Sequence, residues 1–283
     1  MNHEVVVIIG VGGIGQAIAR RQGAGKLLLL ADFNQDTLAS AHRNLETLGY
    51  TVKTQVVDVS SRDAVKALAE TATRLGNVMQ VITTAGLSPN MAPAKSILAV
   101  DLLGVALVLE EFRNVVSAGG AGIVISSMAG HMLPPLTADQ NKALADTPTD
   151  DLLELAFLSN DAISDSGMAY AMAKRANHLR VQVESIHWGQ RGARVNAISP
   201  GIIATPLAQH EMNSPVGHIY RAMIDASSSK RMGTPDEVAT AAAYLLGNDA
   251  SFITGADLLI DGGVIAAMRG GRINLELDTS KSQ

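Results

Sequence analysis

The chain contains no cysteine among its 283 residues, which excludes disulfide bonds and thiolate chemistry. Lys and Arg form no basic block in a chain of formal net charge −5, and this argues against a nucleic acid as partner. No apolar run approaches the ~18 residues needed to span a bilayer, so no membrane association is expected. Residues 1–9 lack the basic start and long apolar core of a signal peptide. We therefore expect a cytoplasmic protein.

Aromatic residues are also scarce, at 3%, while apolar residues as a whole reach 47%. Short apolar runs alternate with longer stretches that suit helices. Strands are expected at Glu4–Ile9, Lys26–Ala31, Val52–Val57, Val78–Thr83, Gly122–Ile125, Arg194–Ile198 and Leu258–Ile260. Helices are expected from about Gln35 and over Arg62–Leu75, Lys95–Val116, Tyr170–Trp188 and Thr234–Leu246. This alternation predicts an α/β fold with a doubly wound parallel sheet of the Rossmann type, in a single domain spanning residues 1–283.

A glycine-rich loop follows the first expected strand and precedes a helix, the context in which such loops bind a pyrophosphate. Its residues are Gly10, Gly12, Gly13, Ile14 and Gly15. The second expected strand ends at Asp32, a position suited to an acid that binds the ribose hydroxyls and repels a 2′-phosphate. No Arg or Lys stands at positions 33–36. We therefore expect NAD rather than NADP.

Tyr170 and Lys174 are four residues apart, which places them one turn apart on the same face of a helix. A free phenol has a pKa near ~10, and a nearby ammonium group lowers it. A phenol tuned in this way can pass a proton to or from a substrate oxygen. An ordinary helix with an exposed Tyr and Lys would show the same spacing, so other parts of the sequence must decide between the two interpretations.

Residues 131–166 interrupt the alternation of strands and helices. Thr137 and Gln140 have the spacing of a capping box, and Thr147 followed by Pro148 suggests a second helix start. The segment carries seven acidic residues and one lysine, with an apolar stripe over Leu152–Leu158. We expect an inserted helical lid over the ligand-binding edge, although a solvated surface insertion explains the same pattern. The polar stretch 207–230 is expected to form a mobile substrate loop.

The joint order of these motifs resembles the short-chain dehydrogenase/reductase family over nearly the whole chain. The shared features include Gly13-Ile14-Gly15, Asp58, Ala85-Gly86, Ser127, Tyr170 with Lys174, and Asn196–Gly201 with Thr205-Pro206. The insertion between Ser127 and Tyr170 is similar to the hydroxysteroid dehydrogenase/carbonyl reductase branch of that family.

Three positions depart from the family pattern. Gly10 and Gly13 are three residues apart instead of four, and the missing position often helps NADP-preferring members. Thr83-Thr84 replaces the usual Asn-Asn, which puts a structural hydrogen bond in doubt. Asp101 replaces the usual Asn, whose backbone carbonyl holds a water for the lysine. The charge of Asp101 would stabilise Lys174 as a cation and oppose a phenolate at Tyr170.

The resemblance implies an oxidoreductase that transfers a hydride between a nicotinamide and a ketone or secondary alcohol. Ser127 would hydrogen-bond the substrate oxygen, Tyr170 would transfer the proton, and Lys174 would favour the phenolate and hold the nicotinamide ribose. Asp101 is included as a fourth catalytic candidate. The resemblance places the cofactor against the glycine loop, Tyr170 and Lys174, and against Asp32, Phe33, Asp58, Val59, Ala85, Gly86, Pro200, Gly201, Ile203 and Thr205. No metal is expected.

Two other functions remain open from the sequence. A 3-oxoacyl reductase would act on substrates attached to an acyl carrier protein, an acidic partner that the acidic insertion would repel. A non-catalytic dinucleotide sensor is suggested by Thr84 and Asp101, although the presence of Ser127, Tyr170 and Lys174 argues against it. Family resemblance also implies a homodimer or homotetramer. One interface would be formed by apolar residues of the last helix and strand, namely Val238, Ala239, Ala242, Tyr244, Leu245 and Leu258, and the insertion could alter or block the other.

Overall fold

Seven parallel strands form one sheet in this computed structural model, which describes residues 3–273. The strand order is β3-β2-β1-β4-β5-β6-β7. The strands are β1 (His3–Ile9), β2 (Leu27–Asp32), β3 (Thr51–Val56), β4 (Gly76–Thr83), β5 (Val116–Ile125), β6 (Arg194–Pro200) and β7 (Asp257–Ile260). The prediction of a doubly wound parallel sheet is confirmed.

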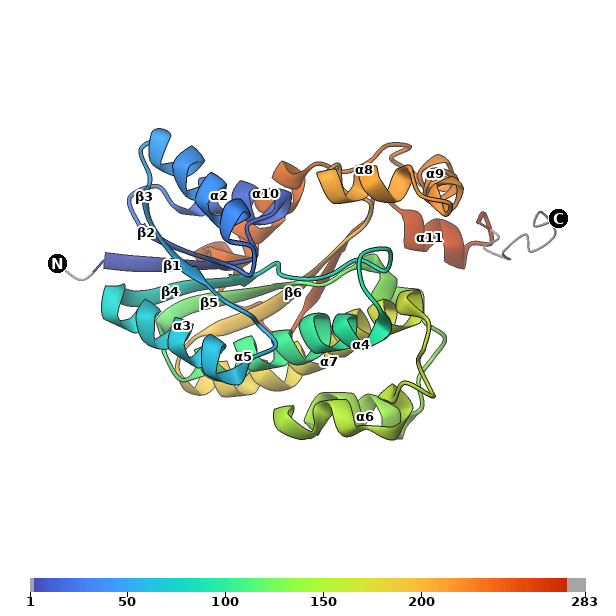
Figure 1. Cartoon of the computed structure of the whole chain (residues 1–283), viewed down its shortest axis with the longest axis horizontal. Helices are drawn as coiled ribbons and strands as arrows, with labels where there is room; N and C mark the ends of the chain where they lie inside the picture. The colour runs from blue at the N-terminus through green and yellow to red at the C-terminus, as the bar shows by residue number, and fades with distance from the viewer. Residues whose placement is uncertain (1–2, 274–283) are drawn as a thin grey trace.

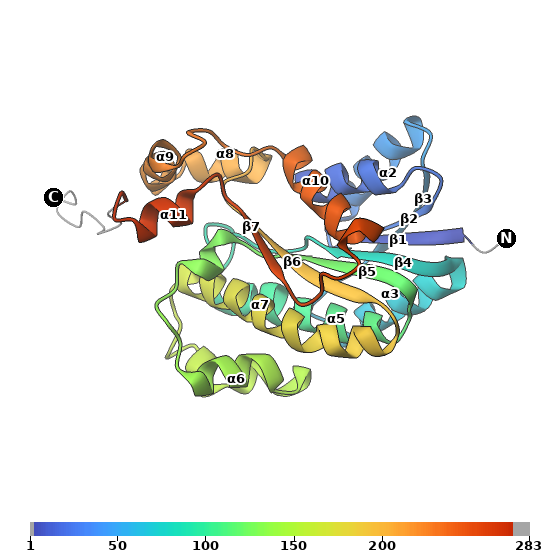
Figure 2. The same cartoon turned by 180° about the vertical axis from the view of Figure 1, so that it is seen from behind.

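Helices cover both faces of this sheet (Figures 1 and 2). One face packs against α1 (Gly13–Gln22), α2 (Gln35–Thr47) and α10 (Pro235–Leu246). The other packs against α3 (Arg62–Leu75), α5 (Val105–Arg113) and α7 (Ser166–Gln190). Strand β1 contributes side chains to the cores on both faces of the sheet. Val5 and Val7 belong to one core, and Val6 and Ile8 belong to the other. Burial on both faces explains why this strand is a continuous apolar run.

The direction of winding changes between β1 and β4, which lie side by side at the centre of the sheet. The chain runs outward from β1 to β2 and β3, and then returns to place β4 on the other side of β1. Ligands of open α/β sheets bind beyond the carboxyl ends of strands at such a point. The glycine loop after Ile9 and the loop after Thr83 both lie there. The topology therefore brings these two loops together.

Several element boundaries differ from the sequence-based expectation. The single helix expected over Lys95–Val116 is divided into α4 (Ala94–Ile97), a π-helix η1 (Leu98–Gly104) and α5. The expected mobile loop contains two helices, α8 (Pro206–Met212) and α9 (Gly217–Ala226). Helix α7 ends at Gln190, two residues beyond the expected end at Trp188.

Further short helices complete the part of the chain that the structure describes. These are η2 (Met128–His131), α6 (Ala138–Asp146), η3 (Thr149–Glu154), η4 (Ala156–Leu158), η5 (Asn248–Ala250) and α11 (Val264–Arg269). No strand or helix was expected over residues 264–283; the structure places α11 at the start of this stretch, and residues 274–283 lie outside the described part of the chain. Within residues 3–273, every helix is too short or too polar to cross a bilayer.

Candidate active site

The glycine loop joins β1 to α1 in the geometry that dinucleotide binding requires. Gly10 has φ +91°, a conformation that favours glycine, and a Cβ on Gly15 would collide with the carbonyl oxygen of Gly10. Nothing lies within 4 Å of the position that a Cβ on Gly12 would take. Gly12 also caps α1 without a side-chain hydrogen bond. The first amides of α1 are therefore open to an anion, and they fit the pyrophosphate of a dinucleotide.

Asp32 ends β2 directly beside this loop. Its Oδ2 accepts a hydrogen bond from the amide of Val11 at 2.8 Å, and its Oδ1 accepts one from the amide of Asn34 at 2.9 Å. Each carboxylate oxygen retains a lone pair that can accept a ribose hydroxyl. Phe33, which follows in the chain, is 73% exposed. The structure therefore brings the expected ribose-binding acid to the glycine loop.

The replacement of asparagine by Thr84 had put a structural hydrogen bond in doubt. The side chain of Thr84 does form a hydrogen bond, which links the loops after β1 and β4. Its hydroxyl donates a hydrogen bond to the carbonyl oxygen of Gly10 at 2.7 Å. The amide of Ala85 donates to the carbonyl oxygen of Ile9 at 3.0 Å. A threonine thus fills the structural position at which the family usually has asparagine.

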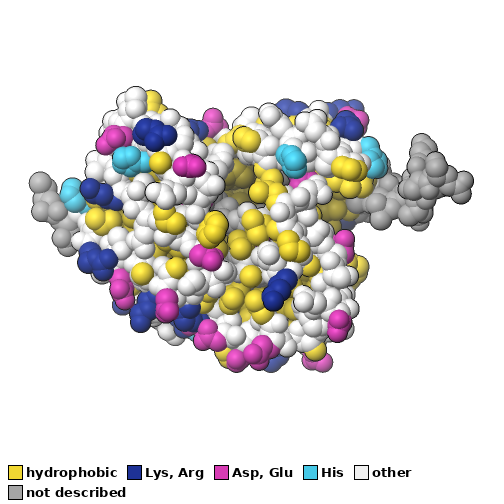
Figure 3. Space-filling view, in the orientation of Figure 1, with side chains coloured by type: hydrophobic (Ala, Val, Ile, Leu, Met, Phe, Trp, Pro, Cys, Tyr) yellow, Lys and Arg dark blue, Asp and Glu magenta, His cyan; other side chains and the backbone are white. Residues whose placement is uncertain are grey.

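A cavity of about 400 Å³ opens at the carboxyl end of the sheet, and its wall includes Ser127, Tyr170 and Lys174. Figure 3 shows apolar side chains gathered in the hollow on this side of the molecule. The other predicted site residues in the wall are Ile14, Gly86, Asp101, Pro200, Gly201, Ile203 and Thr205. Residues from six separate stretches of the chain are thus brought to one cavity, as the motif order predicts.

The remaining predicted cofactor residues lie outside the cavity wall. They are Gly10, Gly12, Gly13, Gly15, Asp32, Phe33, Asp58, Val59 and Ala85. Asp58 accepts hydrogen bonds from the amide and the hydroxyl of Ser60, at 2.9 and 2.7 Å. Val59 is 7% exposed and packs against Gly104 of η1, where an added Cβ would lie 2.8 Å from it. Val59 therefore helps to hold the π-helix against the sheet.

Asp101 and Lys174 form a buried ion pair in the wall of the cavity. Asp101 Oδ2 lies 2.9 Å from Lys174 Nζ, and the two side chains are 0% and 4% exposed. Asp101 Oδ1 accepts a hydrogen bond from the amide of Leu87 at 2.8 Å. The ammonium group also lies 5.2 Å from the centre of the Tyr170 ring. The predicted contact between the unusual aspartate and the lysine is thus present.

Burial and ion pairing shift the pKa values of these two groups in opposite directions. Burial alone would lower the pKa of Lys174, but the charge and the hydrogen bond of Asp101 act together with Tyr170 to outweigh it, and the pKa is raised. Burial also raises the pKa of Asp101, although Lys174 and the Leu87 amide oppose that change. Lys174 is therefore held as a cation beneath Tyr170.

A second polar cluster lies behind the cavity and was not found from the sequence. The hydroxyl of Ser126 donates to the carbonyl oxygen of Lys174 at 2.9 Å and contacts Nε2 of His178 at 3.0 Å. The same nitrogen lies 2.9 Å from the Ser199 hydroxyl, which donates to Asp257 at 2.7 Å. Three strand ends and α7 are thereby connected.

His131 joins this cluster through its Nε2, which lies 2.7 Å from Asp257 Oδ2. His131, His178 and Asp257 are the one group in residues 3–273 with the proximity of metal ligands. Each of these three side chains already has partners within the group or in Ser126 and Ser199. We therefore interpret the group as a hydrogen-bond network.

The stability of the protein should depend on pH through His178. Its pKa is lowered from 6.5 to about 4, because burial disfavours the imidazolium more than Asp257 favours it. Between these two pH values the unfolded chain binds a proton that the folded protein does not, so the free energy of unfolding falls as the pH falls. The loss should reach about 3 kcal/mol.

Thermal unfolding of His178→Gln and wild type between pH 7.5 and pH 4 tests this expectation. The stability advantage of the wild type should shrink on acidification. The matched variant His42→Gln, on the surface of α2, should follow the wild type throughout. A constant difference between His178→Gln and wild type would show that this ring does not carry the pH dependence.

The inserted segment packs on the outer side of α7 and α4, and no residue from 133 to 166 lines the cavity. Leu144, Leu152 and Leu158 are buried there against both helices. Figures 1 and 2 show α6 lying along α7, on its far side from the sheet. The capping box of Thr137 and Gln140 is present, as expected. The segment does not take the position of the expected lid, because its leucines find apolar partners on the helices.

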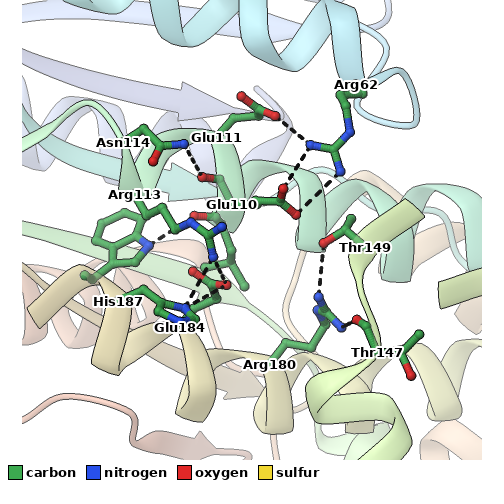
Figure 4. Close-up of polar contacts among 12 residues, drawn as sticks. Arg62, Glu110, Glu111, Arg113, Asn114, Thr147, Thr149, Arg180, Glu184 and His187 are labelled. Atoms are coloured by element: carbon green, nitrogen blue, oxygen red, sulfur yellow. Dashed lines mark hydrogen bonds and ion pairs between the residues drawn. The ribbon is translucent and has the colours of Figure 1, made fainter. Parts of the chain in front are cut away.

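Polar contacts anchor the same segment (Figure 4). Arg180 of α7 donates to the carbonyl oxygens of Leu144 and Thr147, at 3.2 and 3.0 Å, and to the hydroxyl of Thr149 at 3.1 Å. Arg62 of α3 pairs with Asp150 at 2.9 Å. Thr147 ends α6, and the turn after Pro148 is a 3₁₀-helix where an α-helix was expected. Arg180 is more than 30 residues from the groups that it contacts, so the sequence alone does not predict that it anchors the inserted segment.

Comparison with known proteins agrees with this geometry. The short chain dehydrogenase family profile matches residues 4–138, and the Enoyl-(Acyl carrier protein) reductase profile matches residues 136–265. A short-chain dehydrogenase/reductase of Alternaria brassicicola is 42% identical over 269 residues, which are 94% of this chain and 97% of that protein. The chain belongs to the short-chain dehydrogenase/reductase family. It is an NAD(P)-dependent oxidoreductase that acts on carbonyl or alcohol substrates.

Other members of the short-chain dehydrogenase/reductase family are more distant. Levodione reductase of Leifsonia aquatica is 30% identical to this chain, over 93% of this chain and 95% of the length of the reductase. The crystal structure of levodione reductase superposes with a TM-score of 0.74 at 26% identity, over 93% of this chain and 98% of that one. The 3-alpha-hydroxysteroid dehydrogenase/carbonyl reductase of Comamonas testosteroni is 28% identical over 82% of this chain and 93% of its own, a distant similarity to that branch.

Proposed function

We propose that this short-chain dehydrogenase/reductase transfers a hydride between NAD(H) and a ketone or secondary alcohol. The observation that carries the proposal is the single cavity shared by Ser127, Tyr170 and Lys174. When bound, the dinucleotide supplies or accepts the hydride. The residues of this chain orient the substrate oxygen and move its proton.

The proposed roles follow from the positions of the side chains. Ser127 donates a hydrogen bond to the carbonyl oxygen and stabilises the charge that develops there. Tyr170 gives a proton to that oxygen during reduction and takes one from the alcohol during oxidation. Lys174, kept as a cation by Asp101, lies close enough to the Tyr170 ring to stabilise a phenolate. Asp101 acts through Lys174, so we assign it a positioning role.

The cavity favours small uncharged substrates over a carrier-bound acyl chain. Its wall is mostly apolar, and the described lining residues include no arginine. Lys174, the one lysine among them, is already paired with Asp101. An acidic carrier protein would need positive charge around the entrance. A ketone or secondary alcohol requires only the apolar wall and the three reacting side chains.

A spectrophotometric screen tests the proposed function. The protein is mixed with NADH and a panel of cyclic and linear ketones, or with NAD and the matching alcohols, and the absorbance of NADH is followed. We expect turnover of at least one uncharged ketone–alcohol pair. Binding of NADH without turnover of any compound in either direction would favour a dinucleotide sensor.

The cofactor preference should depend on Asp32. NAD(H) should give a higher kcat/KM than NADP(H), because the carboxylate repels a 2′-phosphate and accepts the ribose hydroxyls. Asp32→Ala should reduce the ratio of the two kcat/KM values by about tenfold or more, equivalent to roughly 1.4 kcal/mol. Asp36→Ala, on the exposed first turn of α2, serves as the control. A wild-type preference for NADP(H), or equal values, would contradict the assignment of NAD.

We also propose that the chain self-associates through α10 and β7. Strand β7 is an edge of the sheet, and the nearby Tyr244 and Leu258 are 49% and 37% exposed. The expectation was wrong for Val238, Ala239, Ala242 and Leu245, which are buried in the core beneath α10. The inserted segment covers part of α7, which leaves the α10–β7 surface as the better candidate. We expect at least a dimer. Light scattering at micromolar concentration that gave the mass of a single chain would rule out this assembly.

A further inference from the structure

The wall of the cavity formed by α8 and α9 contains a carboxylate that the proposed reaction does not use. Glu211 of α8 is only 6% exposed, and its Oε2 accepts a hydrogen bond from the side-chain amide of Asn90. Its Oε1 has no hydrogen-bond partner within residues 3–273, although Glu211 belongs to the cavity wall. Leaving a buried oxygen without a hydrogen bond is destabilising, and more so for a charged group. This oxygen is therefore suited to a ligand that donates a hydrogen bond.

Besides the Glu211 carboxylate, this part of the cavity wall contains two neutral polar side chains, Tyr220 and Ser88. The phenol of Tyr220 on α9 faces the same cavity. Burial and the nearby Glu211 carboxylate raise the pKa of Tyr220 to about 12, so this phenol remains protonated. The hydroxyl of Ser88, 6% exposed, also lines the cavity and has no partner within the described chain. Ser88 lies two residues before Asn90 in the same loop.

The cavity wall thus contains two polar surfaces on different elements. Tyr170 and Lys174 are on α7, while Glu211 and Tyr220 are on α8 and α9, which lie on the opposite side in Figures 1 and 2. A substrate that fills the cavity contacts both. The carboxylate of Glu211 can only accept a hydrogen bond, whereas the hydroxyl of Ser88 can donate one. A substrate hydroxyl can satisfy both groups, but an ammonium group, which has no acceptor, cannot.

We infer that Glu211 binds a second hydroxyl group of the substrate, so that the preferred substrates are hydroxyketones and the corresponding diols. This inference rests on the proposed function and specifies its substrate class. A plain ketone of the same size would displace water from the carboxylate without replacing the hydrogen bond. Sites built to bind a substrate hydroxyl discriminate strongly against analogues that lack it.

Matched ketones test the inference. The wild type should show a kcat/KM at least about tenfold higher for 4-hydroxycyclohexanone than for 4-methylcyclohexanone, a conservative bound for a hydrogen bond to a buried charged group. Glu211→Leu should reverse this order, because it removes the acceptor and the unpaired charge together. Glu211→Gln, which keeps the shape, should give an intermediate ratio because neutral hydrogen bonds are weaker. Asp225→Asn, an exposed position on α9, should keep the wild-type ratio.

Equal kcat/KM values for the two ketones in the wild type, or a ratio that Glu211→Leu leaves unchanged, would overturn the inference. A higher kcat/KM for 4-aminocyclohexanone than for 4-hydroxycyclohexanone would overturn the choice of a hydroxyl.

Binding is measured in parallel by calorimetry, using Tyr170→Phe loaded with NAD. This variant should bind 1,4-cyclohexanediol more tightly than 4-methylcyclohexanol, and the additional change Glu211→Leu should remove the difference. If no ketone is turned over, the proposed function fails, and the calorimetry alone decides the role of Glu211: a diol preference that Glu211→Leu removes supports it, and equal affinities reject it.

Discussion

Turnover should fall by at least about 100-fold when Tyr170 is replaced by phenylalanine. The substitution removes one hydroxyl from the cavity wall and leaves the ring, which packs with the helices around it. Lys174 keeps its partner Asp101, so the buried ion pair remains intact. The affinity for the dinucleotide should change little, because the glycine loop and Asp32 are untouched. Steady-state kinetics on the best ketone of the screen and a titration with NADH measure the two quantities.

Tyr50→Phe is the matched control for this substitution. The hydroxyl of Tyr50 donates to the carbonyl oxygen of Arg20 at 2.7 Å, on the surface and away from the cavity. Its loss should leave kcat unchanged. If Tyr170→Phe kept more than about a tenth of the wild-type turnover, another group would have to carry the proton.

The fold was predictable because its signals are local. The β-branched run that ends at Ile9 and the glycines that follow it are adjacent in the chain, and both specify backbone geometry directly. Tyr170 and Lys174 are one helical turn apart, so their proximity also follows from sequence spacing. Comparison with the family pattern showed that Asp101 is unusual. In that pattern this position lies near the lysine, so its contact with Lys174 could also be expected.

The remaining features depend on contacts between distant segments. The inserted segment was expected over the cavity, but Leu144 and Leu152 are buried against helices whose exposed apolar surface no sequence pattern reveals. Glu211 lies in a stretch that is polar and irregular as a sequence, so one buried carboxylate could not be distinguished from its exposed neighbours. Tertiary packing determines both positions.

Asp101→Asn should shift the pH dependence of alcohol oxidation to lower pH by about one unit. Asparagine can keep the hydrogen bond from the Leu87 amide, which Asp101 Oδ1 accepts at 2.8 Å, but it removes the negative charge 2.9 Å from Lys174. That charge opposes a phenolate at Tyr170, so its removal favours the form that takes a proton from the alcohol. The acidic limb of the profile of kcat against pH reports this change.

The same substitution should also lower the melting temperature, because it leaves a buried cation without its partner. Removing one member of a buried ion pair costs about 3–5 kcal/mol. Without the charge of Asp101, burial lowers the pKa of Lys174 relative to the wild type. Asp139→Asn, an exposed position on α6, removes the same charge from the surface and should change neither the melting temperature nor the pH profile. An unchanged or alkaline-shifted profile in Asp101→Asn would contradict the expected opposition between the Asp101 charge and a phenolate at Tyr170.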